Sequence, residues 1–158
     1  LDFSLCQLTS EQISILIKHP HFNQIHTFKL GRSQIGDEGT IKLAAALSNS
    51  QIHTLDLAYN QIGPAGAIKL AAALPNTQIH TLSLGGNRIG DTGAQELAKI
   101  LPSTQIHTLY LGDNQIGAVG ASKLAATLPS TQLHTLNLDY NQQIGAAGAS
   151  ELAAASYS

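Results

Sequence analysis

Hydrophobic and polar positions follow two patterns that alternate along the chain. In Leu55, Asp56 and Leu57 apolar and polar side chains alternate, which predicts a short strand that buries both leucines and points Asp56 outward. Leu70 and Leu74 follow at helical spacing, so the next segment is predicted to form a helix with one apolar face. The sequence therefore predicts a strand followed by a helix that packs back on it.

The same unit recurs along the whole chain. The tetrapeptide Gln-Ile-His-Thr begins at Gln24, Gln51, Gln78 and Gln105, and Gln-Leu-His-Thr begins at Gln132, so the interval between copies is constant. One such unit cannot bury its own apolar face, so neighbouring units must stack into a solenoid. We expect a single domain, 1–158, with a strand in each of six units: a truncated first unit, 1–23, and five full units, 24–50, 51–77, 78–104, 105–131 and 132–158.

The units resemble a known repeat family. Residues 52–62 have the pattern L-x-x-L-x-L-x-x-N-x-I, with isoleucine in the first position, and resemble the signature of leucine-rich repeats. The glycines and helical leucines that follow are similar to the ribonuclease-inhibitor-like subfamily. The resemblance covers nearly the whole chain. It implies an α/β fold, a right-handed solenoid shaped as a horseshoe arc, with a parallel sheet on the concave face and helices on the convex face.

One polar column falls inside the predicted core. Buried amide side chains must be hydrogen-bonded, and the resemblance implies a ladder in which each side chain bonds the backbone of its own loop and of the neighbouring loop. We expect this column to be structural and not catalytic. Its members recur once per unit and are Cys6, Ser33, Asn60, Asn87, Asn114 and Asn141.

A column of histidines lies just before the predicted strands. Parallel strands would space these side chains about 4.8 Å apart, which raises the hypotheses of a metal site and of a pH-sensitive switch. Metal ligands converge on one point whereas a ladder presents a row, so we expect no metal. We expect a structural or solvent-facing role, with repulsion between protonated rings destabilising the fold below about pH 6. The column consists of His26, His53, His80, His107 and His134.

Some positions differ from unit to unit without a structural reason. They are the outward strand position and the residues after it, and three of the four tyrosines fall there. Tyrosine and arginine often carry interface energy, and opposite charges at the two ends would orient a partner. We therefore predict a partner-binding surface, called here the variable strip, that consists of Lys29, Arg32, Asp56, Tyr59, Arg88, Tyr110, Asp113, Asn137, Asp139 and Tyr140.

Composition narrows the classes of partner. Only 11% of residues are charged, the formal net charge is −2, and no run of like charge exceeds two residues. These features argue against binding to nucleic acid or to a membrane surface. The apolar runs are far shorter than the roughly 18 residues that cross a bilayer. Cys6 is the single cysteine and cannot form an intramolecular disulfide, so we expect a cytoplasmic protein.

These observations favour a non-enzymatic module that binds a protein or peptide on its concave face, without a cofactor. No acid–base pair stands outside the repeating columns. The resemblance implies further alternatives: a GTPase-activating or enzyme-inhibiting regulatory protein, a bacterial effector delivered into a host cytosol, and a region of an innate-immune sensor. For GTPase activation the chain offers only Arg32 and Arg88.

The N-terminal end raises a further expectation. Leu1 falls inside a predicted strand and is not an initiator methionine, so we expect the chain to be a piece of a longer protein. An uncapped first unit leaves apolar groups of a solenoid uncovered, so we also expect end-to-end self-association through it.

Overall fold

Five short parallel strands form one sheet in the order of the sequence. The computed structural model describes residues 1–155. Neighbouring strands pair equivalent residues of successive units, as in Leu55 with Leu82 and Leu82 with Leu109. The sequence period thus becomes the register of the sheet. The strands are β1 Thr27–Lys29, β2 Thr54–Asp56, β3 Thr81–Ser83, β4 Thr108–Tyr110 and β5 Thr135–Asn137.

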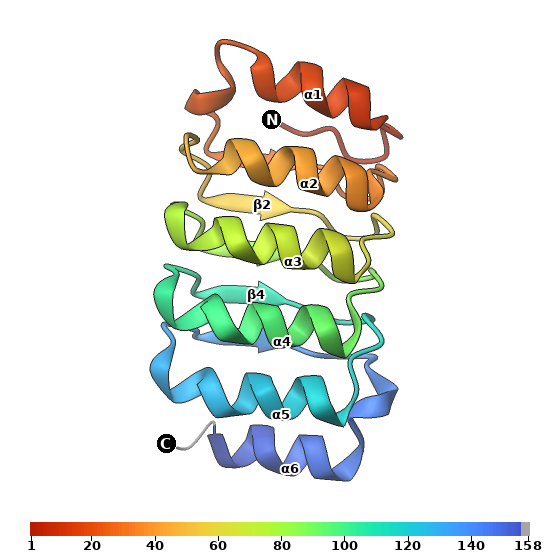
Figure 1. Cartoon of the computed structure of the whole chain (residues 1–158), viewed down its shortest axis with the longest axis vertical. Coiled ribbons are helices and arrows are strands. Elements are labelled where there is room, and N and C mark those ends of the chain that lie inside the picture. Colours follow the sequence, from red (N-terminus) through yellow and green to blue (C-terminus); the bar gives the residue numbers. More distant parts are fainter. Residues whose placement is uncertain (156–158) are drawn as a thin grey trace.

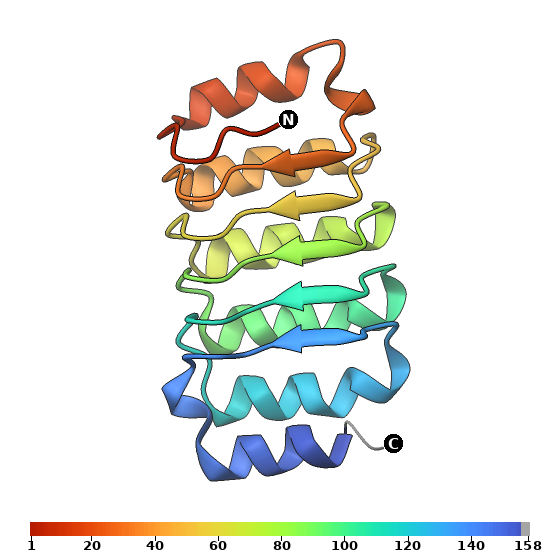
Figure 2. The same ribbon diagram turned by 180° about the vertical axis from the view of Figure 1, so that it is seen from behind.

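One layer of helices covers one face of this sheet (Figures 1 and 2). Packed helices need about 8–10 Å between their axes and strands only about 4.8 Å, which places the sheet on the inner, concave side. The arrangement confirms the predicted α/β solenoid. The helices are α1 Ser10–Lys18, α2 Gly36–Leu47, α3 Pro64–Ala73, α4 Gly90–Ile100, α5 Ala118–Thr127 and α6 Gly145–Ala155.

The first unit differs from the others. The sequence predicts a sixth strand there, but this unit contributes only one isolated parallel bridge, between Asp2 and Lys29. The Phe3 amide donates to the Lys29 carbonyl at 2.8 Å, and the Lys29 amide donates to the Leu1 carbonyl at 3.0 Å. The expectation of six strands is therefore wrong, because the first segment forms a single bridge and not a ladder of paired residues.

The core is continuous from unit to unit. Leu55, Leu82 and Leu109 point inward from the strands and are fully buried. From the helix side, Leu70 and Leu97 are also fully buried, as the helical spacing predicts. Each unit therefore buries apolar side chains against its neighbours, and full burial of a leucine stabilises by roughly 1.5–3 kcal/mol.

A hydroxyl column ends the helices. Helices α3, α4 and α5 each pass into a single 3₁₀ turn that contains a proline: Leu74–Asn76, Leu101–Ser103 and Leu128–Ser130. The hydroxyl of Thr77 donates to the Leu74 carbonyl at 2.8 Å, and Ser50, Thr104 and Thr131 make the same contact. Proline stops the helix, and the carbonyl near its end accepts both the hydroxyl and the backbone amide of the same residue, as Leu74 does from Thr77.

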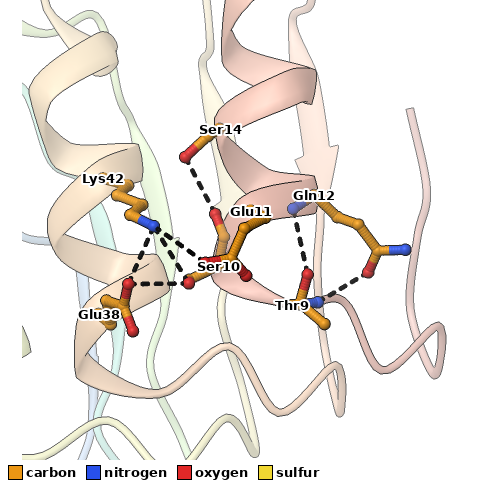
Figure 3. A network of polar contacts seen from close by, with 7 residues as sticks. All are labelled: Thr9, Ser10, Glu11, Gln12, Ser14, Glu38 and Lys42. Atoms are coloured by element: carbon orange, nitrogen blue, oxygen red, sulfur yellow. Dashed lines mark hydrogen bonds and ion pairs between the residues drawn. The ribbon is translucent and has the colours of Figure 1, made fainter.

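Polar side chains tie the first unit to the second (Figure 3). Thr9 and Gln12 form a reciprocal capping box at the start of α1. Lys42 on α2 lies 2.9 Å from the Glu38 carboxylate and 3.1 Å from the Ser10 hydroxyl. The hydrogen bonds from Lys42 and Ser10 lower the pKa of Glu38. The contact between Lys42 and Glu38 therefore stabilises the fold at neutral pH and is lost as the pH falls through that lowered pKa. The exposure of the Glu38 side chain keeps this stabilisation small.

Two aspartates cap helices of the following unit. Asp37 lies in the first turn of α2, yet its Oδ1 accepts hydrogen bonds from the amides of Gly63 and Gly66 at the start of α3 (2.7 and 2.9 Å). Asp91 on α4 caps α5 in the same way through Gly117 and Gly120 (2.7 and 2.9 Å). Neither α3 nor α5 has a side-chain cap of its own. The sequence predicts only that these aspartates favour the start of their own helix.

Replacing Asp91 by alanine should lower the free energy of unfolding by about 1 kcal/mol, because two amides at the start of α5 lose their acceptor. Asp91→Asn keeps an oxygen there and should fall between the wild type and the alanine variant. Urea unfolding measures the difference, and amide exchange should rise first at Gly120. The control is Thr92→Ala at the exposed neighbouring position; an equal effect there would contradict the cap.

Candidate functional site

The asparagine column forms a ladder between neighbouring loops. The Oδ1 atom of Asn87 accepts hydrogen bonds from the amides of Asn60 and Ile62 in the preceding unit (2.9 and 3.0 Å). Its Nδ2 atom donates to the carbonyls of Leu57 and Leu84 (3.0 and 2.8 Å). Asn141 repeats this pattern in full. Asn60 donates to the carbonyls of Leu30 and Ala58, and Asn114 accepts from the Ile89 amide at 3.4 Å. All four side chains are buried.

The two earliest members of the column differ from the asparagines. Ser33 is buried, and its hydroxyl donates to the Phe3 carbonyl at 2.8 Å. Cys6 is exposed, with its Sγ 3.7 Å from the Ser4 carbonyl oxygen. The expectation that Cys6 is buried in this column is therefore wrong, because no loop of an earlier unit covers it in this structure.

The ladder holds the loops on which the variable strip is built. After each strand the backbone pairing continues: the Arg32 amide donates to the Ala58 carbonyl, the Tyr59 amide to Gly85 and the Asp113 amide to Asp139, each at 2.8 Å. The strip is therefore displayed on a rigid backbone, although it lies largely outside the strands.

One column of the strip comes from the last residue of each strand. Parallel register places Lys29 beside Asp56, Asp56 beside Ser83, Ser83 beside Tyr110, and Tyr110 beside Asn137. These side chains share the face of the sheet that the helices do not cover. A positive charge thus starts this column and a neutral amide ends it.

A second column has left-handed backbone. The φ angles of Arg32, Tyr59, Asp113 and Tyr140 are 56°, 56°, 53° and 61°, and that of Gly86 is 68°. Residues other than glycine adopt this region infrequently, so the loop geometry and not local preference fixes these side chains.

Side chains along this second column stack on one another. The guanidinium of Arg32 lies 4.7 Å from the centre of the Tyr59 ring. A Cβ atom at position 86 would overlap that ring, so Tyr59 lies over Gly86 and requires a glycine there. Arg32, Tyr59 and Gly86 therefore form a layered arrangement in the free protein. A cation over an aromatic face contributes about 0.5–1 kcal/mol at an exposed site.

The tyrosines of the strip remain accessible in this arrangement. Exposed fractions are 49% for Tyr59, 41% for Tyr110 and 83% for Tyr140. Arg32, Asp113 and Asp139 are exposed as well, and Arg88 is exposed two loop positions beyond the strip's second column. The strand-end column and the loop column of the strip are thus both paired from unit to unit, and Arg88 belongs to neither column.

Asn137 and Asp139 form a separate polar corner at the C-terminal end of the strip. The Asn137 amide donates to the Asp139 carboxylate at 2.6 Å, and the Asp139 backbone amide donates back to Asn137 at 3.3 Å. This corner fixes a carboxylate one residue before the exposed Tyr140.

A shallow hollow of about 390 Å³ opens at the N-terminal end of the strip, and Leu5, Arg32, Asp56 and Tyr59 are among the side chains that line it. The sequence prediction missed Leu5, which is 69% exposed and has a φ of 66°. The signal was available, because Leu5 precedes Arg32 by one full repeat period and belongs to the same column.

Asp2 stands near the same end. Its carboxylate accepts a hydrogen bond from the Ser4 amide at 2.9 Å and lies 3.9 Å from the Lys29 ammonium. The hydrogen bonds from Ser4, helped by the charge of Lys29, lower the pKa of Asp2. Lys29 is therefore partly balanced by Asp2, and Arg32 is the stronger positive feature of this end of the strip.

The histidine column lies outside the variable strip, just before the strands. Ring centres of successive histidines are 5.2–5.4 Å apart. Within the described residues, no group of three or more histidine, cysteine or acidic side chains could hold a metal ion. None of the described helices is long and apolar enough to cross a bilayer.

Acidification should destabilise the fold through this column. Two charges 5.3 Å apart repel by about 0.8 kcal/mol in water-like surroundings, and folding brings the rings together. Stability should therefore fall as the rings become protonated, and the thermal midpoint at pH 5.5 should lie below that at pH 7.5. A variant with His53, His80 and His107 replaced by glutamine should lose most of this difference; an unchanged difference would contradict the explanation.

The fold and the ladder define a repeat solenoid, and the comparisons place it in a family. A family model described as "Leucine Rich repeat" matches residues 48–71, 76–98, 103–125 and 130–153, which is more than half of the chain. The chain therefore belongs to the leucine-rich repeat family. Domains of this family are typically protein-binding scaffolds.

A solved structure supports the same fold. The chain is similar to "Leiomodin-1 Actin-Binding Site 2 (ABS2)", with a TM-score of 0.71 and 17% identity, over 94% of this chain and 87% of that one. At this identity the likeness concerns the fold alone. A search of curated proteins found no match.

Proposed function

We propose that this protein binds a protein or peptide partner through the variable strip on its concave face. The observation that carries the proposal is the exposure of Tyr59, Tyr110 and Tyr140, at positions near charged residues that vary from unit to unit. Partly exposed tyrosines on a fixed backbone offer contact area at low entropic cost.

Charge along the strip supports an oriented partner. Lys29 and Arg32 stand at the N-terminal end, and Asp113 and Asp139 at the C-terminal end. A partner with acidic groups at one end of its contact surface and basic groups at the other would dock in one direction. Five strands at about 4.8 Å spacing, with the first unit beside them, suit one standard patch of roughly 800 Å².

Three finer assignments belong to the same proposal. The helix-bearing 27-residue units support membership of the ribonuclease-inhibitor-like subfamily. Stacked columns without an acid–base pair of their own support a non-enzymatic role. A single cysteine supports a reducing compartment such as the cytoplasm.

The test is affinity capture from a cytosolic extract with matched variants. The strip variant Lys29→Glu, Arg32→Glu reverses the positive end, and the control Lys69→Glu, Lys123→Glu makes the same change on helices α3 and α5. A partner that the wild type and the control retain, and the strip variant loses, supports the proposal. A partner that the helix-side variant loses instead would contradict it.

Two further measurements separate the alternatives. Nucleotide hydrolysis by any small GTPase that is recovered distinguishes a binding scaffold from an activator. Arg32 and Arg88 are the only arginines of the chain that could supply an activating side chain. Purified actin is a direct probe because the similar structure is described as an actin-binding site. A scaffold leaves the hydrolysis rate unchanged, whereas activation that is lost with Arg32→Ala or Arg88→Ala would favour the regulatory alternative.

A further inference from the structure

All seven histidines of the chain stand in the returns that lead from a helix to a strand. His19 and His21 follow α1, with ring centres 5.5 Å apart. The other five each come one residue before a strand. The described residues therefore carry histidine at one edge of the solenoid, and the variable strip begins at the far end of the strands.

Four of these rings form a regular stack. Ring centres of His26, His53, His80 and His107 are separated by 5.4, 5.2 and 5.3 Å, with interplanar angles of 3°, 21° and 10°. The four rings therefore lie in one continuous row. His134 leaves it, because its ring is turned by 77° against His107. The His107 Nε2 atom lies 3.3 Å from the Gln132 side-chain oxygen.

The backbone fixes the spacing of the stack. The amide of His53 donates to the His26 carbonyl at 2.8 Å, and the amides of His80 and His107 donate to the preceding histidine carbonyl at 2.9 Å. The rings are thus attached to a hydrogen-bonded backbone ladder, so their period cannot drift along the solenoid.

Charged side chains are scarce around the stack. Residues 47–55, 74–82, 101–109 and 128–136 contain no acidic residue, lysine or arginine. At the N-terminal end the Leu1 ammonium group donates to the Thr27 carbonyl at 2.7 Å, and His19, His21 and Lys18 are the other titratable groups of that return. Lys99, near the end of α4, is paired with Glu96 at 2.7 Å.

The nearest acidic group along the strands is Asp56, three residues beyond His53 and therefore about 10 Å away at strand rise. No carboxylate of these returns neutralises the stack when its rings gain a proton. Histidine is the side chain that ordinarily changes charge between pH 8 and 5, whereas glutamate remains largely ionised at pH 5.5. A row of imidazoles without carboxylates nearby can therefore carry only positive charge.

We propose that the histidine stack binds an acidic helical segment of a protein partner when its rings are protonated. A helix rises about 1.5 Å per residue, so carboxylates that alternate at three and four residues recur on one face about every 5.25 Å. That period matches the 5.2–5.4 Å of the rings, so four carboxylates can face four imidazoles in register. This surface is separate from the variable strip and does not depend on the function proposed for it.

The spacing discriminates against an extended partner. Alternate side chains of a strand recur about every 6.6 Å, so three steps along the stack would put a strand about 4 Å out of register. Each carboxylate placed opposite the stack also offsets the repulsion between protonated rings. Binding and the acid sensitivity of the fold are therefore linked: the partner should restore stability that acidification removes.

The test uses a helical peptide of about 21 residues, rich in alanine so that it is long enough to be helical in water, with glutamates at alternating spacings of three and four. Its control has the same composition with the glutamates distributed around the helix. Titration calorimetry at pH 5.5 should give an affinity for the striped peptide at least tenfold above the control peptide and at least tenfold above its own value at pH 7.5. Equal affinity for the two peptides, or at the two pH values, would overturn the proposal.

Variants of the protein make the test specific. The variant His53→Gln, His80→Gln, His107→Gln should lose binding, whereas Lys69→Gln, Lys123→Gln on the helix layer should keep it. The variant His53→Lys, His107→Lys carries fixed charge and should bind the striped peptide at pH 7.5, where acid does not weaken the fold. If that variant is folded by circular dichroism and does not bind the striped peptide, the proposal is overturned. The proposal is also overturned if the wild-type protein binds single-stranded oligouridylate more tightly than the peptide at pH 5.5.

Discussion

Asn87→Ala is expected to lower the free energy of unfolding by about 1–3 kcal/mol and to leave the exposed side chains of the variable strip unchanged. The side chain satisfies the amides of Asn60 and Ile62 and the carbonyls of Leu57 and Leu84, all buried between two units. Alanine leaves the two amides and the Leu57 carbonyl without these partners, whereas the Leu84 carbonyl keeps its hydrogen bond from Asn114. Each unsatisfied buried group costs about 1–3 kcal/mol before relaxation or entering water reduces the loss. We expect a value in the upper part of that range.

Equilibrium unfolding in urea measures this effect, and two further variants calibrate it. Arg88→Ala changes the exposed neighbour and should shift stability by less than about 0.5 kcal/mol. Asn87→Asp keeps an acceptor but loses both donated hydrogen bonds and buries a charge, so it should be at least as destabilising as alanine. A thermal midpoint of Asn87→Ala equal to that of the wild type would show that the ladder does not stabilise the fold.

The repeat made the fold predictable. Leu55 and Leu57 alternate with polar residues, Leu70 and Leu74 have helical spacing, and both patterns return once in every unit, so strand register followed from the period alone. Each local preference agrees with the stacking that the units need, which is the condition under which sequence patterns specify a fold.

Contacts between units could not be predicted in the same way. The sequence places Asp37 and Asp91 at the start of their own helices, but each caps the helix of the next unit, because stacking brings that helix start closer than the sequence suggests. Cys6 occupies the same position in its unit as the buried asparagines, but its side chain is exposed. Burial depends on a neighbouring loop as well as on a position in the unit.

The variable strip shows which part of a site a single sequence can reveal. Its positions follow from the period, and the tyrosines stood out because most other columns are constant. The stacking of Arg32 on Tyr59 over Gly86 depends on left-handed backbone at loop positions that hold five different residue types, which no local preference indicates. Leu5 belongs to the same geometry and was missed because the first unit is irregular.

The side chains of the strip are also held in place before binding, so that a partner causes little further loss of their conformational entropy. Tyr59 rests over Gly86 and under Arg32 before any partner arrives, and the loop backbone is already paired to its neighbour. Removal of the aromatic rings should therefore affect binding much more than folding. Three tyrosine truncations at an interface centre should together weaken affinity about 100-fold or more, since single interface tyrosines often contribute about 2 kcal/mol.

The most direct measurement is the affinity of the variant Tyr59→Ala, Tyr110→Ala, Tyr140→Ala for the partner recovered by capture, determined by calorimetry beside the helix-side control Lys69→Ala, Lys123→Ala. If the variable strip is the interface, the triple variant should fold with a thermal midpoint close to that of the wild type and bind the partner at least 100-fold more weakly. The control should bind as the wild type does. Wild-type affinity in the folded triple variant would contradict the account, and loss of affinity in the control would place the interface on the helices.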